Sequence, residues 1–193
     1  MYFPNDMNFQ YFFFTTYVGY FLQVLPIALF AGIIYVVYHI KQVRKTSTAQ
    51  IIGSSLFVCY IVGLLCVTLF INFIGDIYYY LFYHMPSGRG YQWFTFSYNF
   101  IPNFFIEFNS ENLGNIILYL PFGLLYPLFR NHISWNQSVL VGIIVSISIE
   151  LIQPILGRSF DINDVLLNGI GVIISTIMYS ICKNIVRLFK VKS

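Results

Sequence analysis

The sequence has little charge, since Asp, Glu, Lys and Arg together make up only 9% of its 193 residues. A typical soluble domain carries about 25%. The three cysteines show no paired spacing, which excludes a disulfide framework and a cysteine-based zinc site. No Ser-His-Asp, zinc-ligand or nucleotide-binding motif is present. The net charge of +3 is small and says little about nucleic acid, and we expect no nucleic-acid partner. With 58% hydrophobic residues and a mean hydropathy of +0.74, the composition predicts an integral membrane protein.

Five apolar runs are long enough to cross a bilayer, which requires about 20 residues each. They cover about residues 18–40, 51–74, 112–129, 138–155 and 163–182. The intervening segment 75–111 is rich in Tyr, Phe and Asn, so we expect it to be extracytoplasmic or interfacial. The sequence therefore predicts an all-α fold, a polytopic membrane helical bundle in which residues 1–193 form a single membrane domain.

The basic residues divide unevenly between the two sides of such a bundle. With the C-terminus inside, eight of them face the cytoplasm, namely Lys41, Arg44, Lys45, Arg130, Lys183, Arg187, Lys190 and Lys192. Only Arg89 and Arg158 fall on the other side. Because basic residues concentrate on the cytoplasmic side, we predict an external N-terminus and a cytoplasmic C-terminus.

A polar cluster separates the last two apolar runs, and it consists of Glu150, Gln153, Arg158, Asp161, Asp164 and Asn168. Ionisable residues in or beside a span are costly, so they usually have a partner or a task. The helical rise places Glu150 and Asn168 at similar depth below the outer boundary. Asn112 and Asn115 enter the third span from that same boundary. We therefore expect the polar sides of three helices to converge under the outer leaflet.

Several uses of these residues stay open. Asp161 or Asn112 could cap a helix, and Asn115 or the small residues Gly169 and Gly171 could serve helix packing. The charged members of the cluster exceed what packing needs, which favours a function for them. A carboxylate such as Glu150 can transfer protons, and Arg158 can bind phosphate. Glu150, Asp161, Asp164 and Asn168 could together bind a cation, so the metal and cofactor requirements stay open.

Three stretches resemble the VanZ-like family of bacterial membrane proteins over about residues 91–182. They are N-L-G-N-I-I-L-Y-L-P-F-G-L-L from Asn112, E-L-I-Q from Glu150 and R-S-F-D-I-N-D-V-L-L-N-G-I-G from Arg158. N-F-I-P from Asn99 is similar to the family's Asn-Leu-Ile-Pro-Phe element, although Asn103 replaces the Phe. The resemblance implies a multi-pass protein of the bacterial cytoplasmic membrane. It also implies a link to low-level teicoplanin resistance, with which the founding member is associated.

Our leading hypothesis is an outward-facing polar pocket for a membrane lipid or lipid-linked cell-wall precursor, contributing to teicoplanin or lipoglycopeptide resistance. The candidate ligand-binding residues are Glu150, Gln153, Arg158, Asp161, Asp164, Asn168, Asn112 and Asn115. The candidate structural residues are Pro121, Gly123, Gly169 and Gly171. One alternative is an intramembrane enzyme that modifies a lipid headgroup, with Glu150, Asp161 and Asp164 as catalytic candidates. Another is a structural subunit whose aromatic segment 91–108 docks a membrane protein partner.

Overall fold

The computed structural model describes residues 9–42, 47–88, 90, 93–106, 108–130 and 133–192. Five of its helices are long and apolar enough to cross a membrane, namely Tyr17–Lys41, Thr48–Tyr83, Ser110–Phe129, Trp135–Leu156 and Ile162–Phe189. This confirms the predicted all-α membrane bundle with about five spans. The orientation of the termini stays a prediction, and three residues used for it, Arg44, Lys45 and Arg89, lie outside the described residues.

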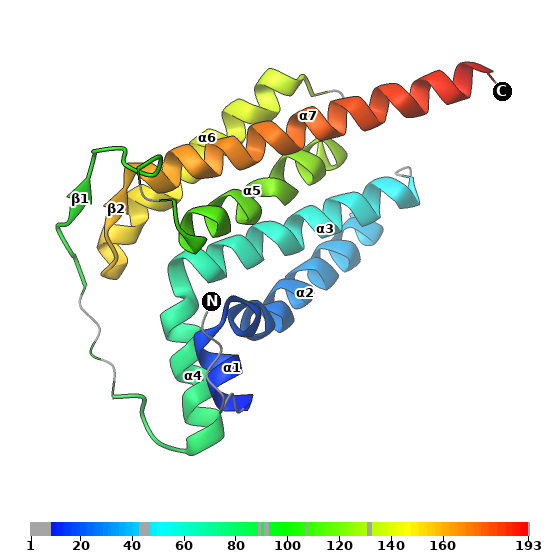
Figure 1. Ribbon diagram of the computed structural model, residues 1–193. Helices are drawn as coiled ribbons and strands as arrows, with labels where there is room; N and C mark the ends of the chain where they lie inside the picture. The colour runs from blue at the N-terminus through cyan, green and yellow to red at the C-terminus, as the bar shows by residue number, and fades with distance from the viewer. Residues whose placement is uncertain are drawn as a thin grey trace.

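The five spans run side by side (Figure 1), and two clusters of buried apolar residues lie between them. They contain α2 (Tyr17–Gln42), α3 (Thr48–Leu65), α5 (Ser110–Phe129), α6 (Trp135–Ile152) and α7 (Ile162–Lys192). α7 packs most extensively on α5 and then on α6, while α3 contacts both α2 and α5. The larger cluster consists of Phe57, Leu64, Tyr119, Phe122, Ile149 and Val172, and a smaller one of Val24, Cys66 and Ile74 joins α2 to the π-helical turn (Cys66–Phe70) and α4 (Ile71–Tyr83). The four helices that carry the larger cluster are therefore fixed against one another.

Small residues bring α5 and α7 close together. A Cβ atom added at Gly171 would collide with the carbonyl oxygen of Ile116, and one at Gly123 would lie 2.6 Å from the backbone nitrogen of Thr176. Both distances are too short for real Cβ atoms, so the two backbones can approach this closely only with glycine there. Gly169 differs, since its added Cβ would meet only Ile143 Cγ1 at an ordinary 3.7 Å. Pro121 lies half-buried inside α5.

The second span continues beyond position 74. α3 passes through a π-helical turn at Cys66–Phe70 into α4 (Ile71–Tyr83), because no proline interrupts the chain from Thr48 until Pro86. α4 leaves the bundle at a steep angle to α3 and lies beside α1 (Phe9–Thr15) (Figure 1). The rings of Phe13 and Tyr78 meet with their centroids 5.3 Å apart. The beginning of the predicted 75–111 segment is therefore an aromatic helix that crosses one end of the bundle.

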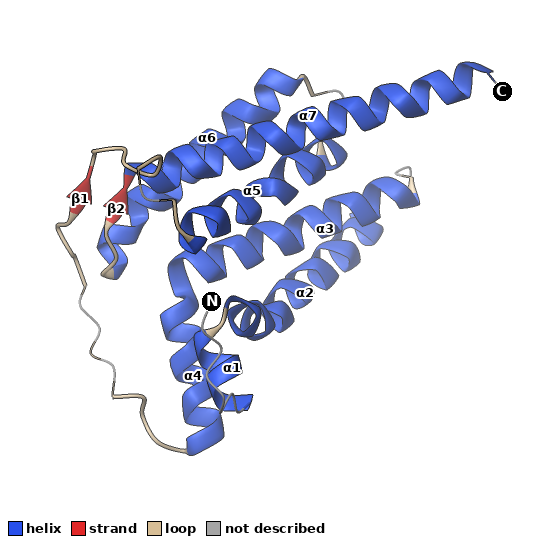
Figure 2. Ribbon diagram, in the orientation of Figure 1, coloured by secondary structure: helices blue, strands red, loops and turns tan. Residues whose placement is uncertain are grey.

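The rest of that segment returns to the junction between α6 and α7. β1 (Tyr98–Asn99) pairs in parallel with β2 (Phe160–Asp161), just before α7 (Figure 2). α6 ends in a 3-10 turn, Gln153–Leu156, and Gly157 follows with φ 80°, a left-handed conformation that suits glycine. The backbone amide of Thr95 donates to the carbonyl of Pro154 over 2.9 Å. The loop is thus fastened to the junction by backbone bonds.

Side chains also connect the elements by donating to main-chain carbonyl oxygens. The Tyr60 hydroxyl of α3 donates to the carbonyl of Leu118 in α5 over 3.0 Å. The other such bonds run from Ser55 Oγ to the carbonyl of Gly32, from Gln23 Nε2 to that of Phe13, and from Arg158 Nη1 to that of Thr68. Each satisfies a polar group that lipid could not satisfy.

The two ends of the bundle differ in charge. We call the end that carries Glu150, Asp161 and Asp164 the acidic end, where α6 stops and α7 starts (Figure 1). The opposite end, where α2 and α5 stop, carries Lys41, Arg130, Lys183 and Arg187, and we call it the basic end. Under the predicted orientation, the acidic end faces outward.

Candidate functional site

The centre of the polar cluster is Glu150, in the last turn of α6. Its side chain is only 2% exposed, and its Oε1 accepts a hydrogen bond of 3.1 Å from Gln153 Nε2. Its Oε2 has no hydrogen-bond partner among the described residues. A buried polar atom without a partner costs about 1–3 kcal/mol, so this oxygen is available to a donor group.

Asn168 of α7 offers a second open acceptor. Its Nδ2 donates to Ser146 Oγ of α6 over 2.9 Å, while its Oδ1 lacks a partner within the described part of the chain. Asn168 is 3% exposed. Ser146 lies one turn before Glu150 on α6. Asn168 therefore contacts α6 about one turn away from Glu150, and the two residues were predicted to lie at similar depth.

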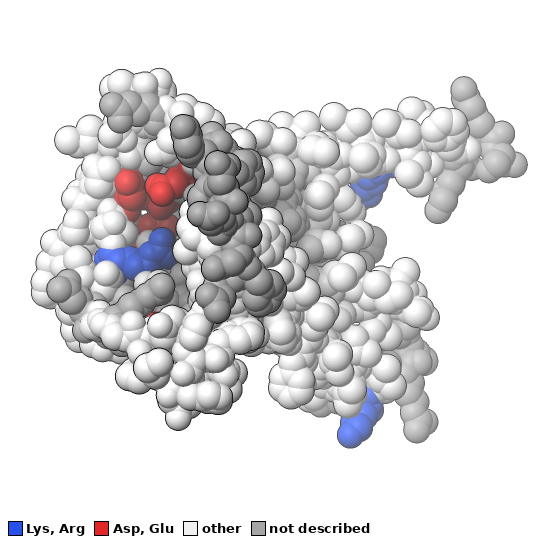
Figure 3. Space-filling model, turned by 60° about the horizontal axis from the view of Figure 1, so that its bottom comes forward, with Lys and Arg blue, Asp and Glu red and all other residues white. Residues whose placement is uncertain are grey.

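A third helix joins the cluster through Asp164. Asn115 Nδ2 of α5 donates to Asp164 Oδ1 over 2.6 Å. Glu150 interacts electrostatically with Asp164 and with Arg158, and so does Asp164 with Arg158. Acidic and basic side chains meet in a hollow of the surface (Figure 3). Residues from α5, α6, α7 and the junction are therefore brought together.

Asp161 has a structural role, the helix cap that was one of the alternatives predicted for it from the sequence. It directly precedes α7, and its Oδ1 accepts bonds of 2.8 Å from both the backbone amide and Nδ2 of Asn163. Asn99 Nδ2 donates to the same carboxylate over 3.2 Å. Its carboxylate thus caps α7 and anchors β1.

Sequence reasoning missed Asn163, which is 6% exposed. Its Oδ1 accepts from the backbone amides of Asn103 (2.8 Å) and Phe104 (3.1 Å), and its Nδ2 donates to Asn103 Oδ1 over 2.8 Å. Asn103, which replaces the Phe of the resembled family element, is therefore a hydrogen-bond partner of Asn163. The only signal was an amide in the first turn of an apolar helix, and a capping role explains that equally well.

Arg158 lies exposed after Gly157 and ties the junction to the π-helical turn. Its Nη1 donates to the carbonyl of Thr68 over 2.6 Å. A guanidinium has further N–H donors, so this bond leaves others for a ligand. Arg158 also lines a pocket of about 220 Å³ between α1, α2 and α4. The same side chain therefore borders both the carboxylates and a cavity.

Gln23 of α2 lies in this pocket and was also missed. It is 1% exposed, and its Nε2 donates to the carbonyl of Phe13 over 2.6 Å. Its Oε1 finds no partner among the described residues, although it lines the pocket with Asn72 and Tyr20. A single amide within an apolar run is equally compatible with helix packing, so Gln23 could not be recognised from the sequence.

Asn112 takes a different place from the expected cap of α5. Asn109 caps that helix, since its Oδ1 accepts a bond of 3.0 Å from the backbone amide of Asn112. The helix begins at Ser110, so Asn112 lies within its first turn. The option of Asn112 as the cap is therefore wrong.

The cluster provides unpartnered hydrogen-bond acceptors and the guanidinium group of Arg158, and it is less suited to binding a metal ion. Among the described residues, no group of three or more His, Cys, Asp or Glu side chains could hold a metal ion. The open oxygens of Glu150 and Asn168 can accept from hydroxyl or ammonium groups. Arg158 can bind an anion such as phosphate. The cluster is therefore suited to a polar group with both donors and negative charge.

Comparison with known proteins gives one match. The model of a family described as VanZ/LLP1 matches residues 57–183, which is more than half of the chain. This range contains Glu150, Arg158, Asp164 and Asn168, whereas Gln23 lies before it. No curated protein matches the chain, and no solved structure does.

Proposed function

Because the chain belongs to the VanZ/LLP1 family, we propose that it binds the polar head of a membrane lipid or lipid-linked cell-wall group at its acidic end. Through this binding it contributes to resistance to teicoplanin or related lipoglycopeptides. The protein is a multi-pass membrane protein, and its acidic end faces outward from the bacterial cytoplasmic membrane. The ligand therefore comes from the outer leaflet.

The observation that carries the proposal is the position of Arg158. It lines the pocket with Gln23 and Asn72, and it interacts electrostatically with Glu150 and Asp164. Guanidinium groups bind phosphate oxygens in charge-assisted pairs. Lipid-linked groups carry phosphate at the depth of such an interfacial arginine. Arg158 is thus the residue that holds the head of the ligand.

The volume of the pocket limits what it can enclose. At about 220 Å³ it is smaller than the roughly 300–1,000 Å³ of usual small-molecule sites. It fits a phosphate and its neighbouring polar atoms, while the apolar chain of the ligand stays in the bilayer. The open oxygen of Gln23 accepts from a hydroxyl or amine of the head.

A susceptibility assay tests this function. In a host where the protein raises teicoplanin resistance, Arg158→Gln should abolish the rise while the membrane level of the protein, measured by immunoblot, stays normal. Arg130→Gln removes the same charge from the basic end and should leave resistance unchanged. Asn72→Ala, at an exposed pocket residue, should weaken resistance without breaking the bond from Arg158 to Thr68. Full resistance in both pocket variants would reject the proposal.

The open Oε2 of Glu150 favours a second candidate, an intramembrane enzyme that modifies a lipid headgroup. In that case the buried carboxyl group acts as general acid or base. Glu150→Gln keeps an acceptor for Gln153 but cannot transfer a proton. Purified protein is incubated with membrane lipids and cell-wall precursors, and products are sought by mass spectrometry. A product that disappears in this variant supports catalysis, and no product from the unmodified protein counts against it.

A further inference from the structure

A second pocket, of about 360 Å³, lies at the basic end, far from Arg158. It is formed where the end of α5, the start of α6 and the middle of α7 meet. Its volume falls within the usual range for small-molecule sites. None of the described residues that line it is acidic. It is therefore a separate cavity with its own chemistry, and the proposed function does not use it.

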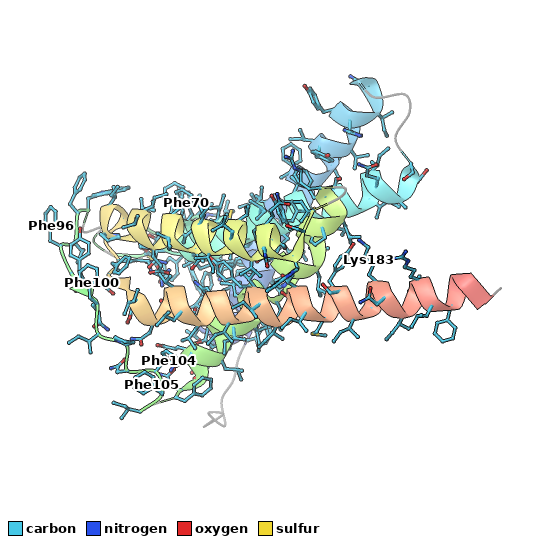
Figure 4. All side chains as sticks on the ribbon, turned by 90° about the horizontal axis from the view of Figure 1, so that it is seen from above. Phe70, Phe96, Phe100, Phe104, Phe105 and Lys183 are labelled. Atoms are coloured by element: carbon cyan, nitrogen blue, oxygen red, sulfur yellow. The ribbon has the colours of Figure 1, made fainter. Side chains whose placement is uncertain are left out.

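Two basic side chains of α7 line this pocket. Lys183 and Arg187 are four residues apart, so they share one face of the helix. Lys183 extends from α7 toward the neighbouring helices of the bundle (Figure 4). Basic side chains also appear on the surface of the projecting end of α7 in Figure 3. The rim of the pocket therefore carries positive charge that attracts an anion.

The inner wall contains two buried hydroxyl groups. Ser138 of α6 is 0% exposed and Thr176 of α7 is 1% exposed. Neither Ser138 Oγ nor Thr176 Oγ1 has a hydrogen-bond partner among the described residues. Nearby hydroxyls are engaged, because Ser134 caps α6 and Ser180 donates to the carbonyl of Thr176 over 3.0 Å. Ser138 Oγ is thus available to an oxygen of a ligand, whereas Thr176 Oγ1 faces Gly123 of α5 within the contact between α5 and α7.

Aromatic and apolar residues around the pocket indicate that the ligand belongs to the membrane. Trp135 and Tyr179 line it, and rings of this kind sit at the level of lipid headgroups. Pro127 and Ile133 add apolar surface to the lining, and on the adjoining face of α7, outside the pocket, Ile177 and Ile181 are 49% and 53% exposed. Acyl chains can lie along such side chains, whereas a free phosphate ion gains nothing from them.

We propose that this pocket binds the phosphate headgroup of an anionic phospholipid from the leaflet at the basic end. Lys183 and Arg187 contact the phosphate, Ser138 Oγ donates to one of its oxygens, and the acyl chains follow α7. Basic pockets between membrane helices on the cytoplasmic side are suited to anionic headgroups. Each basic side chain is expected to strengthen binding about fivefold, and the pair about thirtyfold.

Native mass spectrometry of the full-length protein tests this proposal. The protein is purified in detergent and exposed to phosphatidylglycerol or phosphatidylcholine. It should retain phosphatidylglycerol preferentially, and the double variant Lys183→Gln, Arg187→Gln should lose about thirtyfold in apparent affinity. The control Lys41→Gln, Arg130→Gln removes two charges from the same end outside the pocket and should retain the preference. Ser138→Ala, which removes only the hydroxyl, should weaken phosphatidylglycerol binding while circular dichroism shows an intact helical fold.

The proposal would be overturned by equal retention of both lipids, by an equal loss in the control, or by full binding in the folded pocket variants. Displacement of the lipid by millimolar inorganic phosphate would also overturn it, since that outcome assigns the pocket to the free ion. Because Arg158 is untouched in all these proteins, a failure here leaves the resistance assay at the acidic end unaffected.

Discussion

The close approach of α5 and α7 predicts opposite effects for two glycines that lie two residues apart on α7. Gly171→Ala places a methyl group against the carbonyl oxygen of Ile116. That neighbour is main chain and cannot rotate away, so one of the helices has to move. Gly169→Ala places its methyl group 3.7 Å from Ile143 Cγ1, an ordinary contact.

The magnitude follows from two terms. Replacing glycine by alanine inside a helix stabilises it by about 0.5–1 kcal/mol, and this applies to both variants. Only Gly171→Ala also carries an overpacking cost, about 1–3 kcal/mol. We therefore expect Gly169→Ala to be about 0.5–1 kcal/mol more stable than the parent protein. Gly171→Ala should be about 1–3 kcal/mol less stable than Gly169→Ala, because the helix term cancels between them.

The assay is unfolding of purified protein in mixed micelles, followed by circular dichroism as the denaturing detergent is increased. Both variants are compared with the parent protein in one preparation. If Gly171→Ala were as stable as Gly169→Ala, the backbones of α5 and α7 could not be this close, and the prediction would be wrong.

The remaining predictions concern the loop, the core and the topology. Asn163→Ala removes the acceptor for the backbone amides of Asn103 and Phe104, so the free energy of unfolding should fall by about 1–3 kcal/mol. Limited proteolysis within residues 93–106 should become faster, and unchanged cleavage would contradict the anchoring role. Phe57→Ala empties the core between α3 and α5 and should destabilise the protein by about 3–5 kcal/mol in the same unfolding assay, whereas a loss below 1 kcal/mol would argue against that packing. Green fluorescent protein fused after residue 193 should fluoresce, and alkaline phosphatase fused there should be inactive; the reverse result would place the acidic end inside.

The helical bundle could be predicted because each span is recognisable from the length and hydropathy of its apolar run. The polar faces could be predicted in the same way, since spacings of three and four residues fix which side chains share a helix face. Glu150 and Gln153 are three residues apart, and they are hydrogen-bonded. These features depend only on residues near one another in the sequence.

The features that escaped prediction depend on distant residues. A pair of two-residue strands has no periodicity to detect, so the pairing of Asn99 with Asp161 left no pattern. The pocket around Gln23 arises only because α4 turns across the bundle and meets α1. The π-helical turn Cys66–Phe70, at which α4 changes direction, contains no proline or glycine from which it could have been predicted.

The bonds that side chains make to main-chain carbonyls have a consequence for comparing relatives of this protein. Every amino acid has a carbonyl oxygen, so position 68 can change its side chain while Arg158 keeps its acceptor. Correlated substitutions between these two positions should therefore be weak, even though they touch. Asn115 and Asp164 meet through their side chains, and a change at one should be matched by a change at the other. Contact maps inferred from covariation will thus show the second pair and omit the first.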